Sequence, residues 1–92
     1  MELGSIMKWE RTGERTHELV FENQVRMLLV DGKPCAALVT RVNASPVVIR
    51  SQRTHPEDVE SIISSWVNHQ PVTSAIVPQS TLDRLLDQEG KL

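Results

Sequence analysis

Three histidines are the side chains of this sequence best suited to metal binding or acid–base catalysis. His17, His55 and His69 do not occur in the spacings, such as His-x-x-x-His, that place two imidazoles on one metal ion. His55 lies where we predict a helix to begin. His69 lies in the last turn of that helix, where a charged imidazole favours the helix dipole. We therefore predict no metal site and no catalytic histidine.

The cysteine and the acidic residues also lack the arrangement that catalysis needs. Cys35, the only cysteine, would act as a nucleophile only beside a base that activates its thiol. It follows a predicted hairpin turn, and we interpret it as a small packing residue. Glu57, Asp58 and Glu60 are predicted to form the solvated side of a helix, and the four glycines form no phosphate-binding loop. We predict no catalytic residue and no cofactor, and therefore a protein that is not an enzyme.

The length and composition are those of one small domain. The 92 residues leave room for a single core, and 39% hydrophobic residues with only three aromatics make that core thin. A thin core is often completed by a second subunit, so a homodimer is one alternative. The formal net charge of −2 argues against nonspecific nucleic-acid binding. With one cysteine and no long apolar run, the sequence predicts a cytoplasmic protein that does not enter a membrane.

The first six residues are predicted to lie outside the folded domain. Gly4 and Ser5 precede a second methionine, Met7, in a pattern typical of a cloning remnant. We interpret residues 1–6 as such a remnant or as a disordered N-terminus. A single domain is assigned to residues 7–92.

Short runs of alternating apolar residues predict strands in the first half of the chain. The strongest local signal is Asp31-Gly32, because a two-residue type I′ turn needs positive φ at both positions and Asp-Gly suits it. The predicted strands cover residues 7–11, 15–22, 25–30, 35–42 and 47–50.

The period of the apolar residues changes at residues 54–57. Their sequence, Thr-His-Pro-Glu, has the form of a capping box, in which Thr54 and Glu57 each accept a hydrogen bond from the other's backbone N–H. Apolar side chains then recur every three or four residues, which predicts one long amphipathic helix over residues 55–69.

Two shorter elements are predicted after this helix. Residues 72–77 are β-branched and bounded by prolines, which favours an edge strand. Residues 81–89 have a narrow apolar face and are predicted to form a short C-terminal helix. The predicted fold class is α+β: a four- to five-stranded antiparallel meander packed against one long helix, followed by a short strand and a short helix.

The turns also predict which residues lie opposite each other in the meander, and hence which share a face. A two-residue loop at 31–32 and a four-residue loop at 43–46 set the register. The predicted pairs are Val30–Lys33, Leu28–Cys35, Arg26–Ala37, Val42–Val47 and Thr40–Ile49.

This register divides the sheet into two unlike faces. One face is apolar and is the predicted seat of the 55–69 helix; it carries Val25, Met27, Leu29, Ala36, Leu38, Val42, Val47 and Ile49. The opposite face is also apolar at its centre and has arginines around it, which is unusual for a face turned to solvent. Its cover would be the segment 72–89, a second copy of the chain, or another protein.

We predict that this opposite face binds a partner. Arginine beside aliphatic side chains is typical of protein interfaces, whereas an aromatic platform for nucleic acid is missing. The leading hypothesis is a small non-enzymatic protein-binding regulator or inhibitor, of the kind that phages and mobile elements encode. The predicted partner-binding residues are Arg26, Leu28, Val39, Arg41, Val48 and Arg50.

Two alternatives stay open. One is a nucleic-acid-binding regulator of the antitoxin or repressor type, with Arg26, Arg41, Arg50 and Arg53 on phosphates. Residues 76–82 resemble the strand–proline–helix corner of swapped-hairpin DNA-binding antitoxins, and this resemblance assigns no role to any residue. The other alternative is a homodimer with a structural role.

Overall fold

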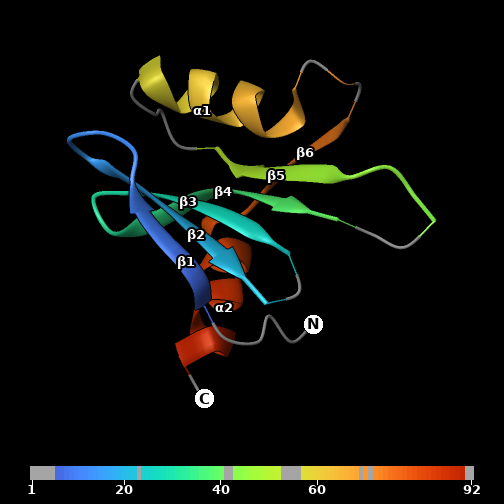
Figure 1. Cartoon of the computed structure of the whole chain (residues 1–92). Coiled ribbons are helices and arrows are strands. Elements are labelled where there is room, and N and C mark those ends of the chain that lie inside the picture. Colours follow the sequence, from blue (N-terminus) through green and yellow to red (C-terminus); the bar gives the residue numbers. More distant parts are fainter. Residues whose placement is uncertain are drawn as a thin grey trace.

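The chain folds into a six-stranded sheet with one helix on each face (Figure 1). The computed structural model describes residues 6–22, 24–40, 43–52, 57–68, 70 and 72–90. The strands lie in the sheet in chain order, so β1 and β6 form its two edges. The strands are β1 (Ile6–Arg11), β2 (Thr16–Phe21), β3 (Arg26–Val30), β4 (Lys33–Val39), β5 (Val47–Ser51) and β6 (Thr73–Val77), and the helices are α1 (Glu57–Val67) and α2 (Gln79–Gly90).

The first five strands form an antiparallel meander, which confirms the α+β class in outline. The edge strand β6 differs from them because it pairs with β5 in parallel, so the chain crosses over through α1. The prediction of one long helix is wrong: α1 has 11 residues, and α2, predicted to be short, has 12. Most of the predicted capping box at 54–57 lies outside the described residues.

The hairpin turn between β3 and β4 forms as predicted. Asp31 has φ 53° and Gly32 has φ +80°, and Val30 pairs with Lys33 across the two-residue loop. The backbone N–H of Asp31 also donates to the Arg15 carbonyl at 2.8 Å. The turn is therefore held from both sides, by its own hairpin and by the segment that leads into β2.

A β-bulge at Cys35 shifts the register just beyond this turn. Leu29 pairs with Pro34 and Leu28 with Ala36, so Cys35 is the extra residue of the bulge. A bulge inserts one extra residue into a strand, and every later pair moves by one. The predicted pairs Leu28–Cys35 and Arg26–Ala37 are therefore wrong, and Arg26 lies opposite Leu38.

The connection between β4 and β5 is longer than predicted. β4 ends at Val39, which pairs with Val47, so residues 40–46 separate the two strands. Asn43 has φ 58° within this connection, a conformation that asparagine tolerates better than most residues. The predicted pairs Val42–Val47 and Thr40–Ile49 are wrong.

The central strands of the sheet are buried on both faces, and each face has its own core. The first core lies between the sheet and α1 and comprises Leu28, Val30, Cys35, Ala36, Leu38, Val48, Val59 and Ile63. The second core lies on the opposite face, where Leu85 and Leu86 of α2 pack against Leu19, Phe21, Val25, Met27 and Leu29. Each large apolar side chain buried in this way contributes roughly 1.5–3 kcal/mol.

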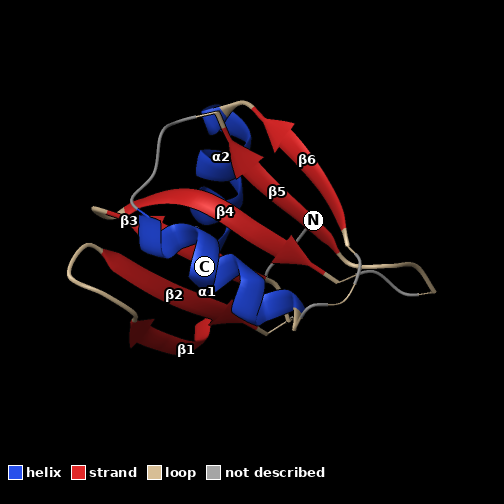
Figure 2. Cartoon of the chain, turned by 90° about the horizontal axis from the view of Figure 1, so that it is seen from above, coloured by secondary structure: helices blue, strands red, loops and turns tan. Residues whose placement is uncertain are grey.

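The predicted face for α1 is correct on β4, where Ala36 and Leu38 lie beneath the helix, but it is reversed on β3 and β5. Val25, Met27 and Leu29 of β3, predicted to lie beneath α1, face α2. Figure 2 shows α1 lying over the central strands, on a right-handed path from β5 to β6, the hand that nearly all parallel crossovers adopt. That connection sets the face on which α1 lies, because both faces are apolar enough to accept it.

Candidate functional site

Two of the residues predicted to bind a partner are in the core beneath α1. Leu28 is 0% exposed and Val48 is 2% exposed, and both belong to the cluster that contains Val59 and Ile63 of α1. A partner has no access to these side chains while α1 is in place. The cover of this face is therefore α1, which was not among the three covers considered from the sequence.

Arg26, another predicted binding residue, takes part in a polar bridge under the edge of α1. Its Nη1 donates to the Glu18 carboxylate at 2.9 Å, and the same carboxylate oxygen accepts the Trp66 indole N–H at 2.8 Å. Glu18 lies on β2 and Trp66 on α1, so the bridge joins two strands to a helix. Its geometry supports a structural role for Arg26.

The remaining predicted residues do not form one exposed surface either. Arg50 forms an ion pair with Glu60 of α1. Val39 is half-buried at the end of β4. Arg41, like Arg53 of the nucleic-acid hypothesis, lies outside the described residues.

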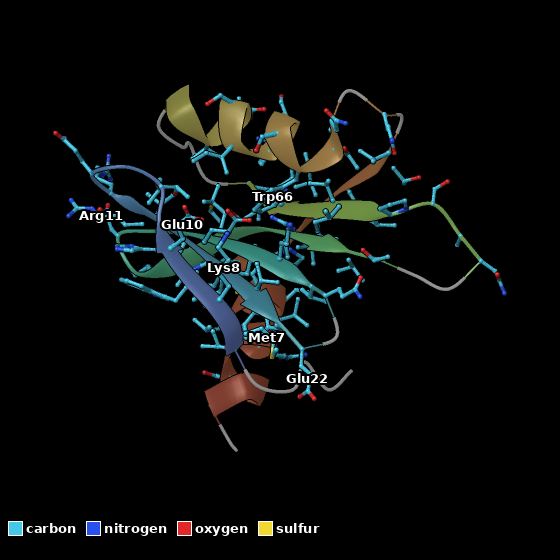
Figure 3. The ribbon with its side chains drawn as sticks, in the orientation of Figure 1. Met7, Lys8, Glu10, Arg11, Glu22 and Trp66 are labelled. Carbon is cyan, nitrogen blue, oxygen red and sulfur yellow. The ribbon has the colours of Figure 1, made fainter. Side chains whose placement is uncertain are left out.

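Exposed apolar side chains gather instead on the edge strand β1. All six of its residues are exposed, among them Ile6 at 39%, Met7 at 68% and Trp9 at 62%. Figure 3 shows Met7, Lys8, Glu10 and Arg11 following one another along this strand. None of these β1 residues is among the predicted binding residues, and Ile6 lies outside the predicted domain, which begins at residue 7. The available signal was topological, since the first strand of a meander lies at an edge.

The two sides of β1 differ in chemistry. Lys8 lies opposite Val20 of β2, and Glu10 lies opposite Glu18. The Lys8 Nζ and the Glu10 Oε2 form an ion pair at 3.1 Å. Because Glu18 bonds to α1, this charged side of β1 is on the α1 face of the sheet. Trp9 lies opposite Leu19 and therefore shares the α2 face.

The indole of Trp9 is held in place on that face by a neighbouring ring. It stacks on the His17 imidazole with a centroid distance of 4.8 Å and an interplanar angle of 24°. Stacking orients the indole but leaves most of its surface in contact with solvent. Trp9 is therefore a positioned, exposed aromatic side chain.

The backbone of β1 has hydrogen-bonding groups that point away from β2. The Thr12 N–H donates to the Thr16 carbonyl at 3.0 Å, which makes these two residues a hydrogen-bonded pair. In an antiparallel ladder such pairs alternate, so Glu10 and Lys8 also bond to β2. The N–H and C=O groups of Trp9 and Arg11 then face outward. No other described strand pairs with this side of β1.

The opposite edge of the sheet has fewer of these features. On β6 the large exposed apolar side chain is Ile76, at 67%. The other residues of the strand are Thr73, Ser74, Ala75 and Val77. Of the two edges, β1 has the larger group of exposed apolar and aromatic side chains.

Neither a metal cluster nor a membrane-spanning helix is found in the described part of the chain. Within those residues, no three or more His, Cys, Asp and Glu side chains are grouped so that they could hold a metal ion. No helix among them is long and apolar enough to cross a bilayer. Cys35 is buried.

Comparison with protein-family models, with curated proteins and with solved structures finds no match to this chain.

Proposed function

We propose that this protein is a small non-enzymatic protein-binding regulator or inhibitor that acts in the cytoplasm, and that β1 is its binding strand. The observation that carries the proposal is the exposure of Ile6, Met7 and Trp9 together on one edge of the sheet. Exposed apolar side chains in a group mark interaction sites. Tryptophan, methionine and arginine, all present on β1, are the residue types enriched at protein interfaces.

The expected mode of binding is the addition of a partner's strand to the sheet. An open edge offers main-chain hydrogen bonds that give affinity, while alternate side chains give specificity. Here Trp9 and Arg11 supply the main-chain groups, and the stacked Trp9 indole supplies a large, oriented contact surface. Long, open edges favour unwanted association, and charged side chains such as Lys8 and Glu10 limit it.

The proposed class of function is the one predicted from the sequence. The proposed binding surface is β1, however, and not the arginine-bordered sheet face. Leu28 and Val48 support the α1 core, and Arg26 and Arg50 pair with acidic side chains of the same molecule. Nucleic-acid binding through these arginines has less support, because a phosphate would have to replace a carboxylate partner at both.

Site-specific photo-crosslinking tests the proposal. We would replace Met7 with a photoreactive phenylalanine and irradiate the protein in extract of its source cells. The matched control carries the same group at Ser64, which is exposed on α1. We expect a discrete protein adduct from position 7 and none from position 64.

A second substitution shows whether the adduct depends on β1 itself. Trp9→Asp, added to the position 7 probe, should abolish the adduct while circular dichroism and the melting temperature remain close to those of the parent. Equal labelling from positions 7 and 64, or no protein adduct from either, would refute the proposal.

A further inference from the structure

The outer edge of β1 is complementary to itself. Lys8 and Glu10 have opposite charges, lie two residues apart and are on the same side of the sheet. The residue between them, Trp9, directs its main-chain N–H and C=O outward. A two-fold axis beside Trp9, perpendicular to the sheet, therefore places the Lys8 of each copy opposite the Glu10 of the other.

We propose that the partner of β1 is a second copy of this chain, bound as an antiparallel strand centred on Trp9, so that two sheets join into one. This inference rests on the proposed role of β1 as a binding strand. The interface is isologous, as in most homodimers, because the same strand contributes both halves. Each copy keeps α1 on the same face of the joined sheet.

The backbone of β1 allows this register. Trp9 would form a hydrogen-bonded pair with the Trp9 of the second copy, each N–H donating to the other's carbonyl. Lys8 and Glu10 would then meet as non-hydrogen-bonded pairs, in which side chains of opposite strands approach most closely. Their main-chain groups remain bonded to β2, so dimerisation breaks no main-chain hydrogen bond between β1 and β2.

Other registers with the same backbone alternation are less favourable. Centring the pair on Arg11 places two guanidinium groups opposite each other and leaves Glu10 facing Thr12. Centring it on Met7 is excluded by the β-bulge between Ile6 and Lys8, which interrupts the alternation at that residue. Like charges directly opposite on paired strands are destabilising. Charge matching therefore selects Trp9 as the centre.

The dimer also covers the exposed Trp9 side chain. Both Trp9 indoles lie on the α2 face of the sheet and would sit side by side across the new strand pair. Met7 is the extra residue of a β-bulge between Ile6 and Lys8, so the regular pairing centred on Trp9 joins residues 8–10 of each copy, and Met7 lies just beyond its end.

Charge-reversal variants test the inference. Lys8→Glu gives a strand edge with two negative charges, and Glu10→Lys gives one with two positive charges. Each variant alone would place like charges opposite each other twice, so we expect its dimer dissociation constant to rise about tenfold or more. Sedimentation velocity from micromolar to submillimolar protein measures this constant.

Mixing the two variants is the decisive measurement. In a mixed dimer the new carboxylate at position 8 of one variant faces the new ammonium group at position 10 of the other, and the unchanged Glu10 faces the unchanged Lys8. We therefore expect the mixture to dimerise about as well as the wild type. The double variant Lys8→Glu/Glu10→Lys should also self-associate. The control Lys33→Glu makes the same charge change at an exposed residue of β4 and should leave the dimer intact.

The outcomes separate this inference from the proposed function. A wild-type chain that remains a monomer throughout overturns the dimer, yet the proposed function stands if the position 7 probe still labels a different protein. A dimer that is indifferent to the charge reversals uses another surface and overturns the register. A monomeric chain whose position 7 probe labels no protein refutes both.

Discussion

The indole N–H of Trp66 in α1 donates a hydrogen bond to the Glu18 carboxylate of β2 at 2.8 Å. The same carboxylate accepts Arg26 at 2.9 Å, and the Glu18 side chain is only 12% exposed. One partly buried acid thus receives two donors, one from the helix and one from a neighbouring strand. This contact connects α1 to β2, which lies three strands away from β5, the strand that precedes the helix in the chain.

Removing the indole donor should weaken the attachment of α1 to β2. We expect Trp66→Phe to lower the free energy of unfolding by about 1–3 kcal/mol, since it leaves a partly buried carboxylate with one donor fewer. Urea denaturation measures the change. The same substitution at exposed Trp9, in dilute solution, should change stability by less than about 0.5 kcal/mol. Equal effects at the two tryptophans would show that the Glu18 contact contributes nothing.

A substitution at Leu28 distinguishes a free binding surface from a core buried beneath α1. If this face were a free binding surface, Leu28→Asp would leave the domain folded. Because Leu28 is fully buried beneath α1, we expect the substitution to place an unpaired carboxylate in the core and to unfold the protein. The loss of amide dispersion in an NMR spectrum reports this. Met7→Asp, the matched exposed control, should retain a native spectrum; a native spectrum for Leu28→Asp would contradict the packing of α1.

Leu82 is the most deeply buried of the described side chains of α2. Leu82 is 0% exposed, whereas Leu85 and Leu86 are only partly buried. Leu82→Ala should lower the free energy of unfolding by about 2–5 kcal/mol, the usual effect of a cavity in a packed core. Ile76→Ala on the outer edge of β6 removes a similar volume from an exposed site and should change it by less than about 0.5 kcal/mol. A small effect of Leu82→Ala would mean that α2 packs only loosely.

Backbone conformation alone should decide which residues are tolerated at position 32 of the Asp31-Gly32 turn. A Cβ atom added at Gly32 meets nothing within 4 Å, but φ is +80° there. Gly32→Ala should therefore destabilise the protein by about 1 kcal/mol through backbone strain without a steric clash. D-alanine at position 32, introduced by chemical ligation, favours positive φ and should restore the stability. If both enantiomers were equally destabilising, a clash and not φ would be responsible.

Features set by neighbouring residues were predictable from the sequence. The 31–32 turn formed where Asp-Gly was found, and Val30 pairs with Lys33 as expected. The apolar stripe that includes Val59 and Ile63 predicted an amphipathic helix, and α1 buries both. These signals are local, since φ preferences and helical periodicity act within a few residues.

The candidate site was not predictable in the same way. The bulge at Cys35 has no signature in the apolar alternation, yet it displaces every pair of β3 and β4 beyond it. Val48 and Leu28 have the apolar character of either a core or an interface, and composition does not distinguish the two. Only the position of α1 shows that they belong to a core.

The sequence by itself determined the α+β class, the meander, its tightest turn and the helical character of residues after 57. The tertiary structure decided which face each helix covers and which apolar side chains remain exposed, Met7 and Trp9 above all. The physical reason is that the placement of α1 follows from the right-handed connection of β5 to β6, a relation between segments that no local pattern encodes. The exposure of β1 follows from its place at the edge of the completed sheet.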